Sequence, residues 1–230
     1  MIPHEPAVHD GPSAMGPRDS AVAMQFDDIQ QQRDTAELGM WTFLVTEVMF
    51  FGALFLAYTV YRLQDEAGFA LASEHMELTL GTLNTAVLLT SSLSMALAVR
   101  AAEAARARQL LGWLSLTTVL GLLFLAIKGY EYYVKYAEHL IPIGWLPFDF
   151  PGEHHGTAKI FYSLYFAMTG LHALHMLIGI GALLTLLALA ARGRLLGERS
   201  SPVHVTGLYW HFVDIVWVFL FPLLYLIGAR

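Results

Sequence analysis

Four titratable side chains form two closely spaced pairs inside otherwise apolar stretches of this 230-residue sequence. His172 and His175 are three residues apart, and so are His211 and Asp214. Residues at positions i and i+3 of a helix share one face, so the two members of each pair point in the same direction. Groups of this kind can bind a metal, carry protons or form hydrogen bonds to a neighbouring helix.

Two further acids, Glu47 and Glu131, also lie in or beside apolar sequence. A charged group in the middle of a bilayer is costly, so it faces the interior of a helical bundle, pairs with another group or stays protonated. The simplest interpretation is that these acids and the two pairs form hydrogen bonds between helices and fix the helix packing. A direct role in proton movement, lipid head-group binding or metal ligation is the alternative.

The spacing of these groups argues against a di-iron site. Such a site in a helical bundle uses Glu-x-x-His motifs, but Phe50 stands at the fourth position of the motif that would begin at Glu47. Val134 stands there in the motif that would begin at Glu131. Cysteine is absent from the chain, which removes thiolate ligands and a cysteine nucleophile.

Haem and catalytic sites have little more support. Two histidines three residues apart on one helix cannot bind opposite sides of one iron, so only His175 together with His211 leaves a haem site open. The Glu-His-His run at 153–155 could form a surface metal site, but adjacent residues point in different directions. No Walker loop, nucleophile elbow or dinucleotide fingerprint occurs. We therefore expect no catalytic residue and no metal in this chain.

Long apolar stretches position these groups. The chain is 56% hydrophobic and 14% charged, whereas ordinary globular domains contain about 25% charged residues. A helix needs about 20 mostly apolar residues to cross a bilayer, and five stretches meet this length: 38–61, 78–99, 110–130, 160–191 and 203–229. The sequence therefore predicts an all-α, polytopic transmembrane helical bundle. The net charge of −6 argues against a nucleic-acid partner.

The residues before the first span, 1–37, are rich in proline and acidic residues and contain no apolar run. We predict a flexible cytoplasmic tail there and no secretory signal. Eight basic residues lie in this tail and in the second and fourth loops, against five on the opposite side. The positive-inside rule therefore places the N-terminus inside and, after five crossings, the C-terminus outside.

Each predicted span or its end also carries a recognisable motif. The motifs are Thr46-Glu47-Val48-Met49-Phe50-Phe51, the Leu-Asn-Thr segment at 83–89, Glu131-Tyr132-Tyr133, Gly170-Leu171-His172-Ala173-Leu174-His175 and Tyr209-Trp210-His211-Phe212-Val213-Asp214-Ile215-Val216-Trp217. In type and order they resemble the motifs of cytochrome c oxidase subunit III. The resemblance covers about residues 38 to 230.

The resemblance implies a bacterial inner-membrane subunit without a cofactor of its own. Haem and copper would lie in the catalytic subunit I and in the copper-centre subunit II, beside which this chain would pack. Family members bind phospholipid in a cleft between helices and support proton uptake and sustained turnover. By analogy, Trp41, Glu47 and His211 are expected to contact lipid. The longest members have seven helices and this chain resembles the last five, so partner helices would supply one wall of such a cleft.

The electron donor distinguishes the alternatives within this family. Thr46-Glu47 and Tyr209-Trp210 favour cytochrome c, because quinol oxidase subunits tend to have Ser-Asp and Leu-Phe-Trp-His-Phe-Leu-Asp in these places. A related subunit that accompanies nitric oxide reductase is a further alternative. A stand-alone transporter using Glu47 and Asp214 is more remote, because transporters often contain inverted repeats and five spans do not divide into two equal halves.

Overall fold

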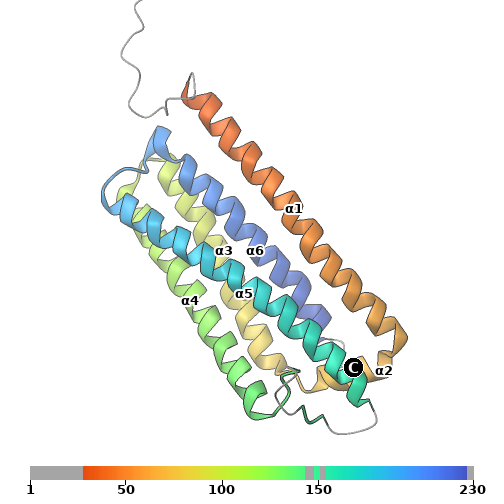
Figure 1. The fold of residues 1–230 in the computed structure, drawn as a ribbon. Coiled ribbons are helices and arrows are strands. Elements are labelled where there is room, and N and C mark those ends of the chain that lie inside the picture. The colour runs from red at the N-terminus through yellow and green to blue at the C-terminus, as the bar shows by residue number, and fades with distance from the viewer. Residues whose placement is uncertain (1–27, 143–147, 151–153, 227–230) are drawn as a thin grey trace, which may run out of the picture.

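The computed structural model describes residues 28–142, 148–150 and 154–226, and these residues form helices and connecting segments without a strand (Figure 1). The helices are α1 (Ile29–Gln64), α2 (Glu66–Glu74), α3 (Leu78–Glu103), α4 (Ala107–Ala137), α5 (His155–Ala191), the 3-10 helix η1 (Gly197–Arg199) and α6 (Ser201–Tyr225). The predicted all-α class is confirmed.

Five of these helices, α1, α3, α4, α5 and α6, are long and apolar enough to cross a membrane, which confirms the predicted number of spans in the described part of the chain. Helix α3 packs against α4 and α6, and α5 packs against the same two helices, so these four form the body of the bundle. Helix α1 lies along the outside against α6 and α5, and the short α2 lies at one end (Figure 1). The chain is a multi-pass membrane protein.

The first helix begins earlier than the sequence predicts. The side chain of Asp28 accepts a hydrogen bond of 2.7 Å from the backbone N–H of Gln31 and caps the helix at Ile29. Residues 29–37, which we expected to belong to the flexible tail, are therefore helical. The rest of the predicted tail, 1–27, lies outside the described residues.

Other helix ends also differ from the predicted spans. Helix α4 continues to Ala137 rather than ending at 130, and α5 begins at His155 rather than at 160. The predicted spans followed hydropathy, which ends at the first polar residues, whereas a helix continues through polar residues at the membrane interface. Helix α6 ends at Tyr225, and residues 227–229 of the predicted fifth span lie outside the described residues.

Helix α6 is the centre of the bundle. In an 18-residue apolar stretch of α6, 56% of the residues are buried, compared with 17% in α1. Trp210 of α6 fills the core, and two glycines make room for it. A Cβ atom at Gly121 of α4 would lie 2.8 Å from the Trp210 ring, and one at Gly179 of α5 would lie 2.9 Å from it. The four-helix body is therefore closely packed around one tryptophan.

Candidate functional site

Glu47 and His175 form a contact between α1 and α5. Glu47 Oε2 lies 3.1 Å from His175 Nε2, and 19% and 10% of the two side chains are exposed. His175 Nδ1 lies 2.9 Å from the carbonyl oxygen of Leu171. A carbonyl only accepts, so Nδ1 carries a proton. Nε2 therefore either accepts from a protonated Glu47 or, in an imidazolium, donates to a carboxylate, and in both cases the pair shares one proton and is neutral overall.

Aromatic side chains surround this pair. The ring of Tyr209 stacks on the His175 imidazole with centroids 6.4 Å apart, and its hydroxyl donates to the His175 carbonyl oxygen at 3.0 Å. The ring of Phe51 lies 5.4 Å from the same imidazole. The shared proton is thus held in apolar surroundings, where hydrogen bonds are strong and unpaired charges are costly.

His172 has a different environment from His175, although the two share a face of α5. It is buried, and its ring lies 5.4 Å from the ring of Phe124 and 5.2 Å from that of Trp217. Neither ring nitrogen has a hydrogen-bond partner in the described part of the chain. The expected interhelical hydrogen bond is therefore formed by His175 and not by His172.

In the second pair, His211 and Asp214, only the histidine forms a hydrogen bond to another helix within the part of the chain that the structure describes. His211 Nδ1 lies 2.7 Å from Ser92 Oγ and joins α6 to α3. Asp214 is buried, and neither of its carboxyl oxygens makes a hydrogen bond of acceptable geometry within the described residues, although the Ser92 hydroxyl faces it. The i, i+3 spacing places both side chains toward α3 but does not make them one site.

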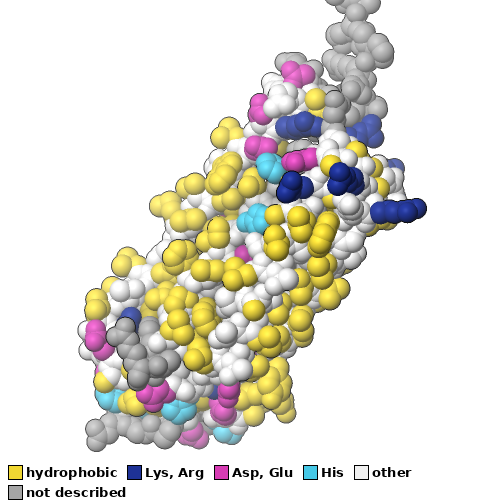
Figure 2. All heavy atoms as spheres, turned by 180° about the vertical axis from the view of Figure 1, so that it is seen from behind, with side chains coloured by type: hydrophobic (Ala, Val, Ile, Leu, Met, Phe, Trp, Pro, Cys, Tyr) yellow, Lys and Arg dark blue, Asp and Glu magenta, His cyan; other side chains and the backbone are white. Residues whose placement is uncertain are grey.

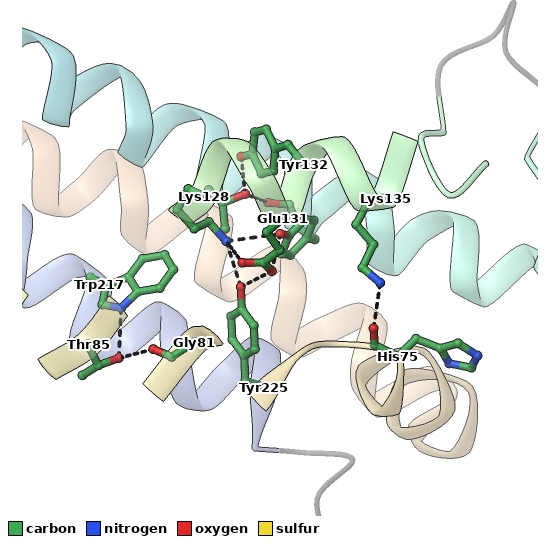
Figure 3. Close-up of polar contacts among 11 residues, drawn as sticks. His75, Gly81, Thr85, Lys128, Glu131, Tyr132, Lys135, Trp217 and Tyr225 are labelled. Atoms are coloured by element: carbon green, nitrogen blue, oxygen red, sulfur yellow. Dashed lines mark hydrogen bonds and ion pairs between the residues drawn. The ribbon is translucent and has the colours of Figure 1, made fainter. Parts of the chain in front are cut away.

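Glu131 belongs to a buried polar cluster that the sequence analysis missed (Figure 3). Lys128 Nζ lies 3.0 Å from Glu131 Oε2 and donates to the hydroxyls of Tyr165 at 3.2 Å and Tyr225 at 2.8 Å. Both hydroxyls donate in turn to Glu131 Oε1. The cluster connects α4, α5 and α6. We define these four residues as the lysine cluster.

Lys128, one of the five basic residues that the sequence analysis counts on the side opposite the N-terminus, lies in the interior of the bundle. Its ammonium group is buried, 5.0 Å from the ring of Trp217. Lys135 is buried as well and donates to the carbonyl oxygen of His75 at 2.8 Å (Figure 3). The i, i+3 spacing of Lys128 and Glu131 was the sequence signal that could have revealed the cluster.

An apolar groove of about 580 Å³ lies between α1 and α6, and we call it the α1–α6 groove. Two of the three residues expected to contact lipid, Trp41 and His211, line it. Glu47 is not among its lining residues, because the carboxyl group turns toward His175. Figure 2 shows hydrophobic side chains along the length of the bundle. Lys and Arg gather at one end together with some acidic and histidine side chains, and Asp, Glu and His lie at the other end.

Metal-binding geometry does not arise among the described residues, where no three His, Asp or Glu side chains come together in a way that could hold an ion. Within the Glu-His-His run, His154 Nδ1 contacts Asp65 Oδ2 at 2.8 Å, His155 contacts the carbonyl oxygen of Phe148, and Glu153 lies outside the described residues.

Comparison with known proteins gives consistent similarities over most of the chain. The family model for cytochrome c oxidase subunit III matches residues 21–141 and 152–229. A probable cytochrome c oxidase subunit 3 of Nocardia farcinica is 31% identical over 218 residues, covering 94% of this chain and 98% of the relative. The cytochrome bo(3) ubiquinol oxidase subunit 3 of Pseudomonas aeruginosa is 31% identical over 191 residues, covering 83% and 84%. A cytochrome c oxidase subunit and a quinol oxidase subunit are therefore equally identical in sequence to this chain.

Proposed function

This chain belongs to the cytochrome c oxidase subunit III family, and from that premise we propose that it is the accessory subunit III of a proton-pumping cytochrome c oxidase. As a subunit III of the haem–copper oxidase family, it works in a respiratory complex with other oxidase subunits. We propose subunits I and II as its direct partners. Family membership argues against a stand-alone transporter.

The engagement of its histidines supports a role without a cofactor in this chain. Both ring nitrogens of His175 are occupied, one by the Leu171 carbonyl and the other by Glu47. His211 is bonded to Ser92 through Nδ1. Because His175 has no ring nitrogen left for a metal, the pair of histidines that could together have bound a haem is not available. We assign haem and copper to the partner subunits, and we propose that Glu47, Glu131, His172, His175, His211 and Asp214 act through packing and local electrostatics.

The α1–α6 groove supports a role in lipid binding. Its walls are almost entirely apolar, which suits acyl chains, and Trp41 is an aromatic residue of the kind that prefers the membrane interface. We propose that a phospholipid occupies the groove and that a partner helix covers its open side. At the end of the bundle near the start of α1, exposed acids and bound head groups would assist proton uptake by the partner subunit.

Cytochrome c is the electron donor we propose, because the motifs at Thr46-Glu47 and Tyr209-Trp210 favour it. The test is purification of the intact complex through an affinity tag on this chain, followed by oxygen-consumption assays with reduced cytochrome c and with a quinol. We expect a haem-containing partner and oxidation of cytochrome c. If the complex oxidises quinol but not cytochrome c, the proposed electron donor is wrong. Consumption of nitric oxide would indicate the related subunit of nitric oxide reductase. If no haem protein co-purifies, the proposed role in an oxidase is wrong.

We propose an orientation with the N-terminus inside the bacterial inner membrane, because exposed arginines gather at the end of the bundle where α1 begins. The chain contains no cysteine, so single cysteines report their side without background from this subunit. We expect Ala104→Cys to react with a membrane-impermeant maleimide only from the cytoplasm, and Ala67→Cys only from outside. Both positions are exposed. The reverse labelling would contradict the orientation.

A further inference from the structure

Each of the four helices in the body of the bundle contributes one buried side chain to the same level of its interior. They are Asn84 of α3, Lys128 of α4, His172 of α5 and Trp217 of α6, and at most 3% of any of them is exposed. We call these four residues the interior layer. Each side chain carries a group that forms hydrogen bonds, so the layer is a polar site inside a membrane-spanning bundle.

The register of α3 and α4 brings Asn84 to the level of Lys128. The hydroxyls of Ser94 and Thr117 lie 2.7 Å apart and fix this register. The two helices are antiparallel, because only residues 104–106 connect them. Asn84 precedes Ser94 by ten residues and Lys128 follows Thr117 by eleven. The two residues therefore lie about 15 Å and about 17 Å from the hydroxyl contact, in the same direction.

The register of α4 and α5 brings His172 to this level as well. The hydroxyls of Tyr132 and Thr169 lie 2.6 Å apart. His172 follows Thr169 by three residues and Lys128 precedes Tyr132 by four, so they lie about 5 Å and about 6 Å from the contact along antiparallel helices. A direct contact agrees with this, because the ring of His172 lies 5.4 Å from that of Phe124, one turn before Lys128.

Trp217 holds the layer together. The imidazole of His172 lies 5.2 Å from its indole ring, and the ammonium group of Lys128 lies 5.0 Å from it. The indole N–H donates to the hydroxyl of Thr85, the neighbour of Asn84 on α3, at 3.1 Å (Figure 3). The indole therefore extends from α6 to α3 and contacts side chains of α4 and α5.

Two members of the layer have all their donors occupied. Lys128 uses its three N–H groups for Glu131 and the hydroxyls of Tyr165 and Tyr225. Trp217 has a single donor, which is bonded to Thr85. Neither side chain has an acceptor, so neither can supply a hydrogen bond to Asn84 or His172.

The other two members lack partners in the part of the chain that the structure describes. The amide oxygen and nitrogen of Asn84 make no hydrogen bond there, and neither do the two ring nitrogens of His172. A buried polar group without a partner costs free energy, and the bilayer around the bundle offers none. Polar groups of this kind in protein interiors are typically bonded to ordered water.

We propose that the interior layer is a water-binding site, in which ordered water connects the amide of Asn84 to the imidazole of His172. Helices α3 and α5 both pack against α4 and α6, so this water joins the two helices that lie across the body from each other. Water both donates and accepts, and it therefore suits either orientation of the amide and either tautomer of the imidazole. The inference does not depend on the molecule in the α1–α6 groove or on the electron donor.

Cryo-electron microscopy of the intact complex in lipid nanodiscs, at a resolution that shows ordered water, tests the site without any substitution. We expect water density about 3 Å from the Asn84 amide and from a His172 ring nitrogen, continuous between the two side chains. A direct hydrogen bond between Asn84 and His172 would overturn the proposal, and so would water at only one of them or at neither.

Apolar variants give a second measurement, with Thr90→Val as the control. Thr90 is an exposed residue of α3 whose hydroxyl bonds only within its own helix. We expect Asn84→Leu and His172→Phe each to lower the unfolding temperature of the complex and to remove the connecting water, whereas Thr90→Val retains both. The double variant should lose less than the two single losses together, because either substitution already breaks the connection. If both single variants unfold at or above the temperature of the unmodified complex, the side chains were unpaired and the proposal is wrong.

Discussion

Lys128 and Glu131 lie 3.0 Å apart in the interior of the bundle, with 4% and 1% of their side chains exposed. Desolvation of two charges in such a place is unfavourable unless the geometry is good and the remaining donors and acceptors are satisfied. The hydroxyls of Tyr165 and Tyr225 complete these hydrogen bonds. The lysine cluster therefore stabilises the junction of α4, α5 and α6 only while all its members are present.

Removal of the cation alone should consequently be more damaging than removal of both charges. In Lys128→Met, the Glu131 carboxylate loses its counter-ion, and we expect the free energy of unfolding to fall by about 3 kcal/mol. The double variant Lys128→Met/Glu131→Gln leaves no charge in the lysine cluster and should recover a large part of this loss. Thermal unfolding of the purified complex measures both, and equal losses in the two variants would contradict the cluster's role.

Packing around Trp210 gives a second prediction. A Cβ atom at Gly121 would lie 2.8 Å from the indole ring, which is fully buried and has no room to move. We expect Gly121→Ala to destabilise the protein by about 1–3 kcal/mol through overpacking. Gly112→Ala on the same helix is the control, because its Cβ would meet nothing within 4 Å. Equal unfolding temperatures for the two variants would show that the contact is not restrictive.

The sequence predicted the helical class and the five spans because long apolar stretches can satisfy their backbone in lipid only as helices or closed barrels. It also predicted that Glu47 and His211 would form hydrogen bonds between helices. In the structure, Glu47 contacts His175 and His211 contacts Ser92. These outcomes follow from the cost of polar groups in a membrane.

The same reasoning failed where partners come from distant parts of the chain. Lys128 entered the sequence analysis only through the count of basic residues on each side, and no partner was predicted for it, yet the hydroxyls of Tyr165 and Tyr225 make its burial favourable. The spacing of His172 and His175 predicted a shared face but not their separate neighbours. Which side chains meet depends on how the helices pack, and periodicity within one helix does not contain that information.

The contact between Asp65 and the start of α5 predicts sensitivity to acid. The pKa of Asp65 is lowered from 3.8 to about 2 by the Thr157, Gly68 and His154 donors. Its contribution to stability is therefore present above pH 4 and is lost as the pH falls through 2. We expect Asp65→Asn to unfold at a lower temperature than the unmodified protein at neutral pH, and this difference should shrink toward pH 2. Glu66→Gln, at the exposed neighbouring acid, should show no such difference.

Filling the α1–α6 groove should displace lipid. Gly52 lines the groove, and a Cβ atom there would meet nothing within 4 Å, so a phenylalanine can enter without a clash. We expect Gly52→Phe to reduce the phospholipid that co-purifies with the complex, as measured by lipid mass spectrometry. Gly39→Phe adds the same side chain to α1 outside the groove lining and should retain the lipid. Equal lipid content in the two variants would place the lipid elsewhere.

Removal of this chain from the purified complex tests its accessory role most directly. The haem absorption spectrum and the rates of the first turnovers are recorded before and after stripping, followed by long oxygen-consumption traces. We predict an unchanged haem spectrum and normal first turnovers at neutral pH, with slower proton uptake at high pH and earlier inactivation during sustained turnover. Loss of a haem absorption band together with this chain would contradict the account, because the chain would then be a redox subunit.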